Sequence, residues 1–171
     1  MKQFKTLLIA AALFIGATSF TNAQSKVAHI NTSELIKAMP EMKSAQSEME
    51  KLGKTYDSDI KAMQNEYKAK MEKYNAEAAT KTQEENEKRV IEVQKMEQDI
   101  QQYANTAQRD LQQKEIDFLK PITEKAKAAI LKVAKAQGFD YVLDSTQGGG
   151  VIMANGKDLL ADVKKELGIT Q

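Results

Sequence analysis

The chain has 171 residues, with 25 basic and 24 acidic side chains, two prolines, no cysteine and no tryptophan. The lack of cysteine excludes disulfides and thiolate metal sites, and a net charge of +1 offers no concentrated basic surface for nucleic acid. Charged residues, Gln, Ala and Met dominate the middle of the chain, a composition that favours long helices.

The first 23 residues have the pattern of a secretory signal peptide. Lys2 and Lys5 give a basic start, an unbroken apolar run follows from Leu7 to Ile15, and small residues lead to Ala23. The apolar run is too short to cross a bilayer, which takes about 20 residues. We expect cleavage after Ala23, which leaves 23 bases (25 less Lys2 and Lys5) against 24 acids in an exported protein.

The first structural elements are predicted immediately after this segment. Residues 26–30 are partly β-branched and alternate, which is typical of a strand. Asn31, with Glu34 three positions later, predicts a helix cap in which the Asn side chain accepts from first-turn amides and the glutamate reaches back. A short helix over 33–39 should end at Pro40, which in turn can open the next helix.

A very long helical region is predicted from 41 to 137, where Gly53 is the only glycine and Pro121 the only proline. Its apolar residues recur every eleven residues. Eleven residues in three turns is about 3.67 residues per turn, which keeps the apolar residues in one stripe on one face of a nearly straight helix. The stripe consists of Met49, Leu52, Tyr56, Ile60, Met63, Tyr67, Met71, Tyr74 and Ala78, and later of Val93, Met96, Ile100, Ala104, Ala107, Leu111, Phe118, Ile122, Ala126, Ala129 and Val133.

The stripe lapses in a polar run over 80–89, which predicts the tip of a helical hairpin. Periodicity alone also permits one unbroken rod. The strands predicted on both sides decide for the hairpin, because a rod would leave each strand fragment without partners and small isolated sheets are marginal. Arms of roughly 45 residues would be about 65 Å long.

The C-terminal part is predicted to return to β structure. Gly138 followed by Phe139 fits a left-handed helix cap, and strands over 139–144 and 151–154 flank a glycine-rich turn. A last helix should run from about 158 to 167. The fold class is therefore α+β and mostly α: a helical hairpin over 41–137 projects from a small β-rich body formed by 24–40 and 138–171.

Neither catalysis nor a cofactor has support in the sequence. His29, the only histidine, lies in a predicted strand, and we interpret it as a strand residue at a sheet edge. The three glycines 148–150 lack the lysine and hydroxyl residue of a phosphate-binding loop and precede a strand instead of a helix. We therefore predict no enzyme activity, no metal site and no cofactor.

The hairpin seam is soft, because Met and Tyr outnumber Leu and Ile along the outgoing arm and alanine fills much of the returning one. Most seam residues should hold the two arms together. Methionine adapts to many shapes and tyrosine combines an apolar ring with a polar end, and Val90, Ile91 and Tyr103 fall off the main seam. Our candidates for contact with a varied partner chain are Met63, Tyr67, Met71, Tyr74, Val90, Ile91, Met96 and Tyr103.

The predicted body has too few apolar strand residues for a self-sufficient sheet, so several copies of the chain are expected to close one together. The residues expected to form this oligomer body are Val27, Ile30, Ile116, Leu119, Ile130, Tyr141, Leu143, Val151 and Ile152. Physical reasoning from the sequence does not fix the number of copies.

The order of strand, short helix, Pro40 and long charged helices resembles the Skp/OmpH family, as do the junction 138–144 and the later 157–160 segment. The resemblance implies an ATP-independent periplasmic holding chaperone, a homotrimer whose arms enclose unfolded outer-membrane proteins. The near balance of charges departs from the strongly basic character of well-known members and argues against membrane or lipopolysaccharide contact. A periplasmic coiled-coil spacer or scaffold without clients remains the alternative.

Overall fold

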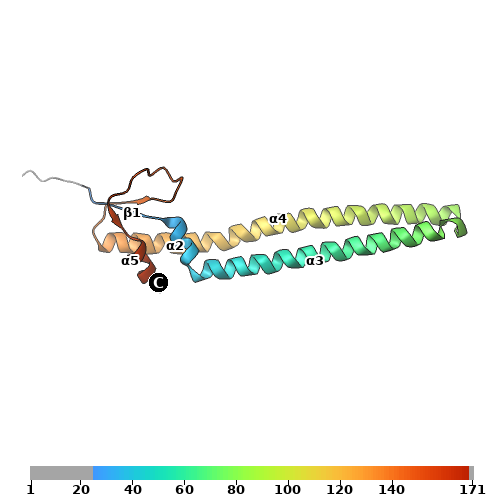
Figure 1. Ribbon diagram of the computed structural model, residues 1–171, viewed down its shortest axis with the longest axis horizontal. Helices are drawn as coiled ribbons and strands as arrows, with labels where there is room; N and C mark the ends of the chain where they lie inside the picture. Colours follow the sequence, from blue (N-terminus) through green and yellow to red (C-terminus); the bar gives the residue numbers. More distant parts are fainter. Residues whose placement is uncertain (1–24, 170–171) are drawn as a thin grey trace, which may run out of the picture.

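The computed structural model describes residues 25–169, so the predicted signal peptide lies outside the described residues. Two long antiparallel helices extend side by side from a small base, and the short elements gather at one end (Figure 1). In chain order the elements are β1 (Val27–Ile30), α2 (Thr32–Ala38), α3 (Pro40–Glu77), the 3₁₀ turn η1 (Ala78–Thr80), α4 (Gln83–Ala136), β2 (Tyr141–Asp144), β3 (Lys157–Asp158) and α5 (Leu160–Glu166).

The predicted hairpin is confirmed, and its two arms keep one register from root to tip. In the residue pairs that bond across the arms, the residue number on α3 rises by as much as the number on α4 falls. These pairs are Glu41–Lys125 at the root, Tyr56–Asp110 in the middle and Tyr74–Glu92 near the tip. A constant register is what an eleven-residue stripe on nearly straight helices requires. With 38 residues, α3 is about 57 Å long.

The turn at the tip lies earlier than predicted. It occupies Ala78 to Thr82, whereas most of the polar run assigned to the tip already belongs to α4. Thr82 caps α4 in a capping box: its hydroxyl accepts from the Glu85 amide at 3.2 Å, and the Glu85 carboxylate accepts from the Thr82 amide at 3.2 Å. The run is therefore polar because it begins a solvated helix, not because it forms a loop.

At the base, β1 lies between two parallel neighbours in the order β2-β1-β3. Ala28 and Ile30 face inward and pack with α2, α4 and α5. The largest fully buried side chains of this core are Ile30, Leu35, Met39, Leu159 and Val163. Because the connection between parallel strands β1 and β2 must cross over, the whole helical arm serves as that crossover.

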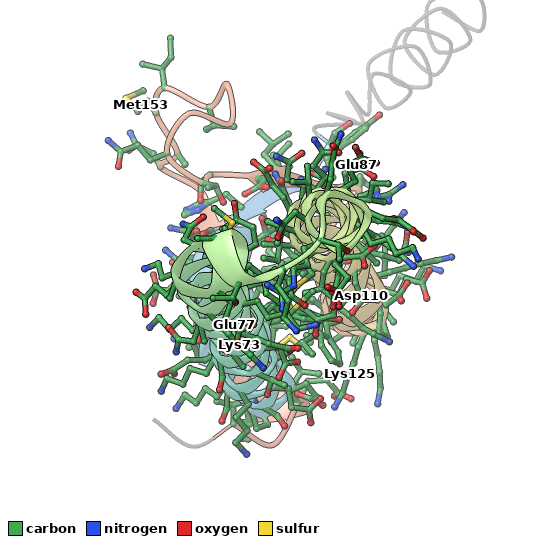
Figure 2. The ribbon with its side chains drawn as sticks, turned by 90° about the vertical axis from the view of Figure 1, so that its right-hand side faces the viewer. Lys73, Glu77, Glu87, Asp110, Lys125 and Met153 are labelled. Carbon is green, nitrogen blue, oxygen red and sulfur yellow. The ribbon has the colours of Figure 1, made fainter. Side chains whose placement is uncertain are left out.

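The predicted strand over 151–154 is wrong. These residues form no strand, the side chains of Ile152 and Met153 are 102% and 76% exposed, and the third strand is Lys157–Asp158. A tight turn can join only antiparallel strands, and here β2 and β3 lie on opposite sides of β1. Gly148 and Gly150, with φ of 86° and 87°, help to form the loop between them. Figure 2, a view along the arm, shows Met153 on this loop, clear of the helices.

Two of the predicted helix ends are confirmed. Pro40 is the first residue of α3. Gly138 is left-handed at φ 70°, and the Phe139 amide donates to the Ala134 carbonyl at 3.0 Å, as in a Schellman cap. The last helix begins later than predicted, at Leu160, because the Leu159 amide still donates to the His29 carbonyl at 3.0 Å and so continues the sheet.

The predicted cap of the first helix is half confirmed. Asn31 Oδ1 accepts from the Glu34 amide at 3.0 Å, but the Glu34 carboxylate does not reach back. It accepts instead from Lys164 Nζ at 3.2 Å, so a tertiary ion pair replaces the local bond and joins α2 to α5.

Asp144 joins β2 to the start of α2. Its carboxylate accepts from the Thr32 hydroxyl at 2.6 Å and from the Thr146 hydroxyl at 2.7 Å, and also from both backbone amides. Burial by itself raises the pKa of Asp144, but these hydrogen bonds outweigh it and hold the pKa at about 2. The ionised form is therefore favoured by the fold.

Asp144→Asn should reduce the free energy of unfolding at pH 7 by about 1 kcal/mol, less than is usual for hydrogen bonds to a charged group, because the residue is largely exposed. Since the folded pKa is lowered, the contribution is complete above the unfolded value of 3.8 and disappears as the pH falls toward about 2. Urea unfolding at a series of pH values measures this. Asp57→Asn, on an exposed surface of α3, is the control, and equal pH dependence of both variants would contradict the prediction.

Candidate functional site

A groove of about 390 Å³ opens beside the tip of the arm, between α3 and α4. Four of the residues predicted to contact a partner line it: Tyr67, Met71 and Tyr74 from α3, and Val90 from α4. Its remaining lining residues are Asn75, Ala78, Asn86, Arg89, Val93, Gln94 and Glu97. The groove is thus an apolar strip with polar side chains around it.

Arg89 organises the tip end of this groove. Its guanidinium lies 4.5 Å from the centre of the Tyr74 ring and donates to Glu77 Oε2 at 2.6 Å. The hydrogen bond from Arg89 holds the pKa of Glu77 below its usual value. Arg89 stands at a position of the apolar stripe, so a stacked and paired guanidinium takes the place of an apolar contact there.

A second polar link lies one turn further from the tip. Lys70 Nζ and the Tyr74 hydroxyl both donate to the Glu92 carboxylate, the latter at 2.6 Å. These bonds lower the pKa of Glu92, and the bond to Glu92 raises the pKa of Tyr74. The two links together fix the α3–α4 pairing at the end of the arm that is far from the hydrophobic core.

The sequence predicted that Tyr103 falls off the main seam. In the structure, Tyr103 takes part in the contact between the two arms. Its hydroxyl donates to Asp59 Oδ2 at 2.6 Å, and its ring meets Tyr56 edge-on at 5.9 Å between centroids. Tyr56 in turn donates to Asp110 Oδ2 at 2.7 Å. The hydrogen bond to Asp59 raises the pKa of Tyr103 to about 12. Tyr103 therefore holds the arms together.

The other predicted contact residues divide into two groups. Met63 and Met96 are half-buried in the seam. Val90 and Ile91 are 55% and 65% exposed, as expected for positions off the seam. Val90 and Ile91 therefore offer more surface to another molecule than Met63 and Met96 do.

The predicted body residues are spread over the base and the lower arm. Ile30 is in the core, Ile130 packs against it, and Leu119 and Val151 are half-buried. The residues that remain exposed are Val27, Ile116, Tyr141, Leu143 and Ile152. Val27, Tyr141 and Leu143 share the outer face of the sheet, because the register pairs Val27 with Tyr141 and β-strand side chains alternate.

A second apolar groove, of about 530 Å³, lies at the base between α2, α4 and β2. Ile36, Ile130, Leu131 and Phe139 line it, and Leu131 is 48% exposed. The base thus offers an apolar groove and an apolar sheet face in the single chain, in the region expected to contact other copies.

His29 lies in the central strand and not at the sheet edge that we predicted. Its Nδ1 is 3.2 Å from the Ser145 hydroxyl. Within residues 25–169, no three acidic or histidine side chains converge as a metal site would require, and none of the helices there contains an apolar stretch of membrane-spanning length.

The raised pKa of Tyr103 gives a test of the inter-arm bonds. Unfolded tyrosine ionises near 10, so the stabilisation from the Tyr103–Asp59 bond should be complete below pH 10 and disappear as the pH rises toward about 12. In an ultraviolet titration, Tyr103→Phe should remove a component that ionises near 12. Ionisation of all tyrosines near 10 in the wild-type chain would contradict the assignment.

Comparison with known proteins gives consistent relationships. The family model for OmpH-like outer membrane proteins matches residues 26–167. The chaperone protein Skp of Pectobacterium atrosepticum is 26% identical over 155 residues, which cover 91% of this chain and 93% of Skp. A crystal structure from Caulobacter crescentus, described as an OmpH-like outer membrane chaperone, superimposes with a TM-score of 0.76 over 85% of each chain at 16% identity. Since the family model covers nearly the whole described chain, this protein belongs to the OmpH-like family.

Proposed function

We propose that this protein is an ATP-independent holding chaperone that binds unfolded outer-membrane proteins and keeps them from aggregating. The similarity to Skp, a protein named as a chaperone, supports the class of function. The exposed apolar surface of the arm, together with its groove, supports a role in binding.

The observation that carries the proposal is the exposure of Val90, which lines the groove, and of Ile91, the next residue of α4, on a helix pair that extends far beyond its hydrophobic core. An unfolded barrel protein exposes alternating apolar side chains and unpaired strand edges. Weak contacts with several such arms would retain it by avidity, while each single contact would release it easily. Val90, Ile91, Tyr67 and Met71 are the proposed contact residues, and Met63, Met96, Tyr74 and Tyr103 act mainly by holding the arm together.

The proposed active form is a homotrimer in which the three bases associate and the three arms surround the client. The exposed sheet face of Val27, Tyr141 and Leu143 and the groove beside Leu131 supply apolar area for this association. Exposure of so many apolar side chains on one small base favours their burial against further copies.

We infer that the protein works in the periplasm after removal of residues 1–23. The basic start and short apolar run of that segment support export. A chaperone in that compartment has no ATP supply, so release must depend on a more stable destination for the client.

The bonds between the arms give some support to the alternative function, a spacer without clients. Three tyrosines that donate to carboxylates across the arm would also stiffen a scaffold. A stiff scaffold, however, has no use for exposed Val90 and Ile91. The two functions differ in whether the protein interacts with unfolded chains.

The test is dilution of a urea-denatured outer-membrane barrel protein into buffer containing residues 24–171, with aggregation followed by light scattering. One trimer per client should suppress aggregation. Val90→Ser combined with Ile91→Ser should raise the concentration needed for half suppression about fivefold or more, since about 1 kcal/mol of apolar contact is lost per arm.

Gln64→Ser, which changes an exposed polar residue of α3, is the control and should behave as wild type. Sedimentation of the same samples gives the number of copies. A protein that leaves aggregation unchanged would favour the spacer, and a monomer would contradict the proposed trimer whose arms surround the client.

A further inference from the structure

The four tyrosines of the arm do not have equivalent surroundings. Tyr56, Tyr74 and Tyr103 each donate a hydrogen bond of 2.6 to 2.7 Å to a carboxylate on the opposite helix. Among the residues that the structure describes, the Tyr67 hydroxyl has no such partner. By the register of the Tyr56–Asp110 and Tyr74–Glu92 pairs, Asp99 stands opposite Tyr67, yet no hydrogen bond joins these two residues.

Tyr67 is also one of the residues that line the groove beside the tip. Its ring is half-buried and contributes to the apolar strip with Met71 and Val90. Tyrosine is well suited to such a place, because its ring supplies apolar contact and its hydroxyl can both donate and accept a hydrogen bond.

The charges around the groove indicate which kind of segment fits it. Arg89 is neutralised by Glu77, and the only other charged lining residue is Glu97, which lies at the end away from the tip. Apart from the hydroxyls of the two tyrosines, the remaining polar lining consists of the amides of Asn75, Asn86 and Gln94, and Asn86 Nδ2 already donates to the Ala78 carbonyl at 2.9 Å. This surface complements a neutral segment with free backbone groups, and it does not attract an acidic peptide.

We propose that Tyr67 is a client-recognition residue: its hydroxyl bonds the backbone of an extended, uncharged client segment whose apolar side chain occupies the groove beside Met71 and Val90. The inference rests on the proposed chaperone function and assigns a different role to the other three tyrosines, which fasten the arms. An unfolded chain that will form β structure has unpaired backbone carbonyls, and a buried carbonyl left without a partner is costly. A tyrosine hydroxyl in an apolar groove satisfies that carbonyl regardless of client sequence.

The experiment compares Tyr67→Phe with Tyr56→Phe in the full chain from residue 24. Each variant loses one hydroxyl from the same arm, so the two are matched in chemistry. Binding is measured by fluorescence anisotropy with a urea-denatured, dye-labelled outer-membrane barrel protein. Arm stability is measured in the absence of client by amide hydrogen exchange.

Tyr67→Phe should weaken binding about fivefold or more, the equivalent of one hydrogen bond in each arm, and leave amide exchange of the arm unchanged. Tyr56→Phe should bind within about twofold of wild type, below the loss of one such hydrogen bond, and exchange faster around positions 56 and 110. A Tyr67→Phe variant that binds as wild type overturns the assignment, and one that speeds arm exchange as Tyr56→Phe does makes Tyr67 a fourth inter-arm bond.

Failure of this assignment differs from failure of the proposed function. If the wild-type chain holds the client and Tyr67→Phe holds it equally well, only the role of Tyr67 is refuted. If the wild-type chain does not bind the client, the chaperone function and the role of Tyr67 are both refuted.

Discussion

The antiparallel pairing of α3 with α4 is the constraint on which the rest of the structure depends. The arms keep one register from the Glu41–Lys125 pair at the root to the Arg89–Glu77 pair at the tip. This pairing brings the two ends of a very long helical region back to one place, where β1 and β2 lie side by side. Without this return, β1 would have no β2 beside it, and the core beneath the sheet would lack the side chains of α4.

The arm and the base are held together by different means. The base has a closed core in which Leu35, Met39 and Val163 are fully buried. The arm has a narrow seam in which most apolar side chains are only half-buried, and hydrogen bonds from tyrosine to carboxylate add to it. A seam of this kind keeps the arm extended and leaves apolar side chains such as Val90 free for other contacts.

The features that local chemistry determines were predictable from the sequence. The eleven-residue spacing predicted the seam, Pro40 predicted a helix start and Gly138 predicted a left-handed cap. Features that depend on distant partners were not: Glu34 pairs with Lys164, Tyr103 bonds Asp59, and the expected strand at 151–154 gives way to one at 157–158. The inter-arm partners of the site become predictable only when the turn is known to end at Thr82, because the register is counted from there.

The most direct test of the account asks where an unfolded client touches the protein. A photo-crosslinking amino acid is placed at Val90, beside the groove, or at Lys165, an exposed position of α5 at the base. Denatured barrel protein is then added and irradiated. The account predicts strong crosslinks from position 90 and none above background from position 165. Crosslinks from the base alone, in a protein that still prevents aggregation, would contradict the claim that the arm holds the client.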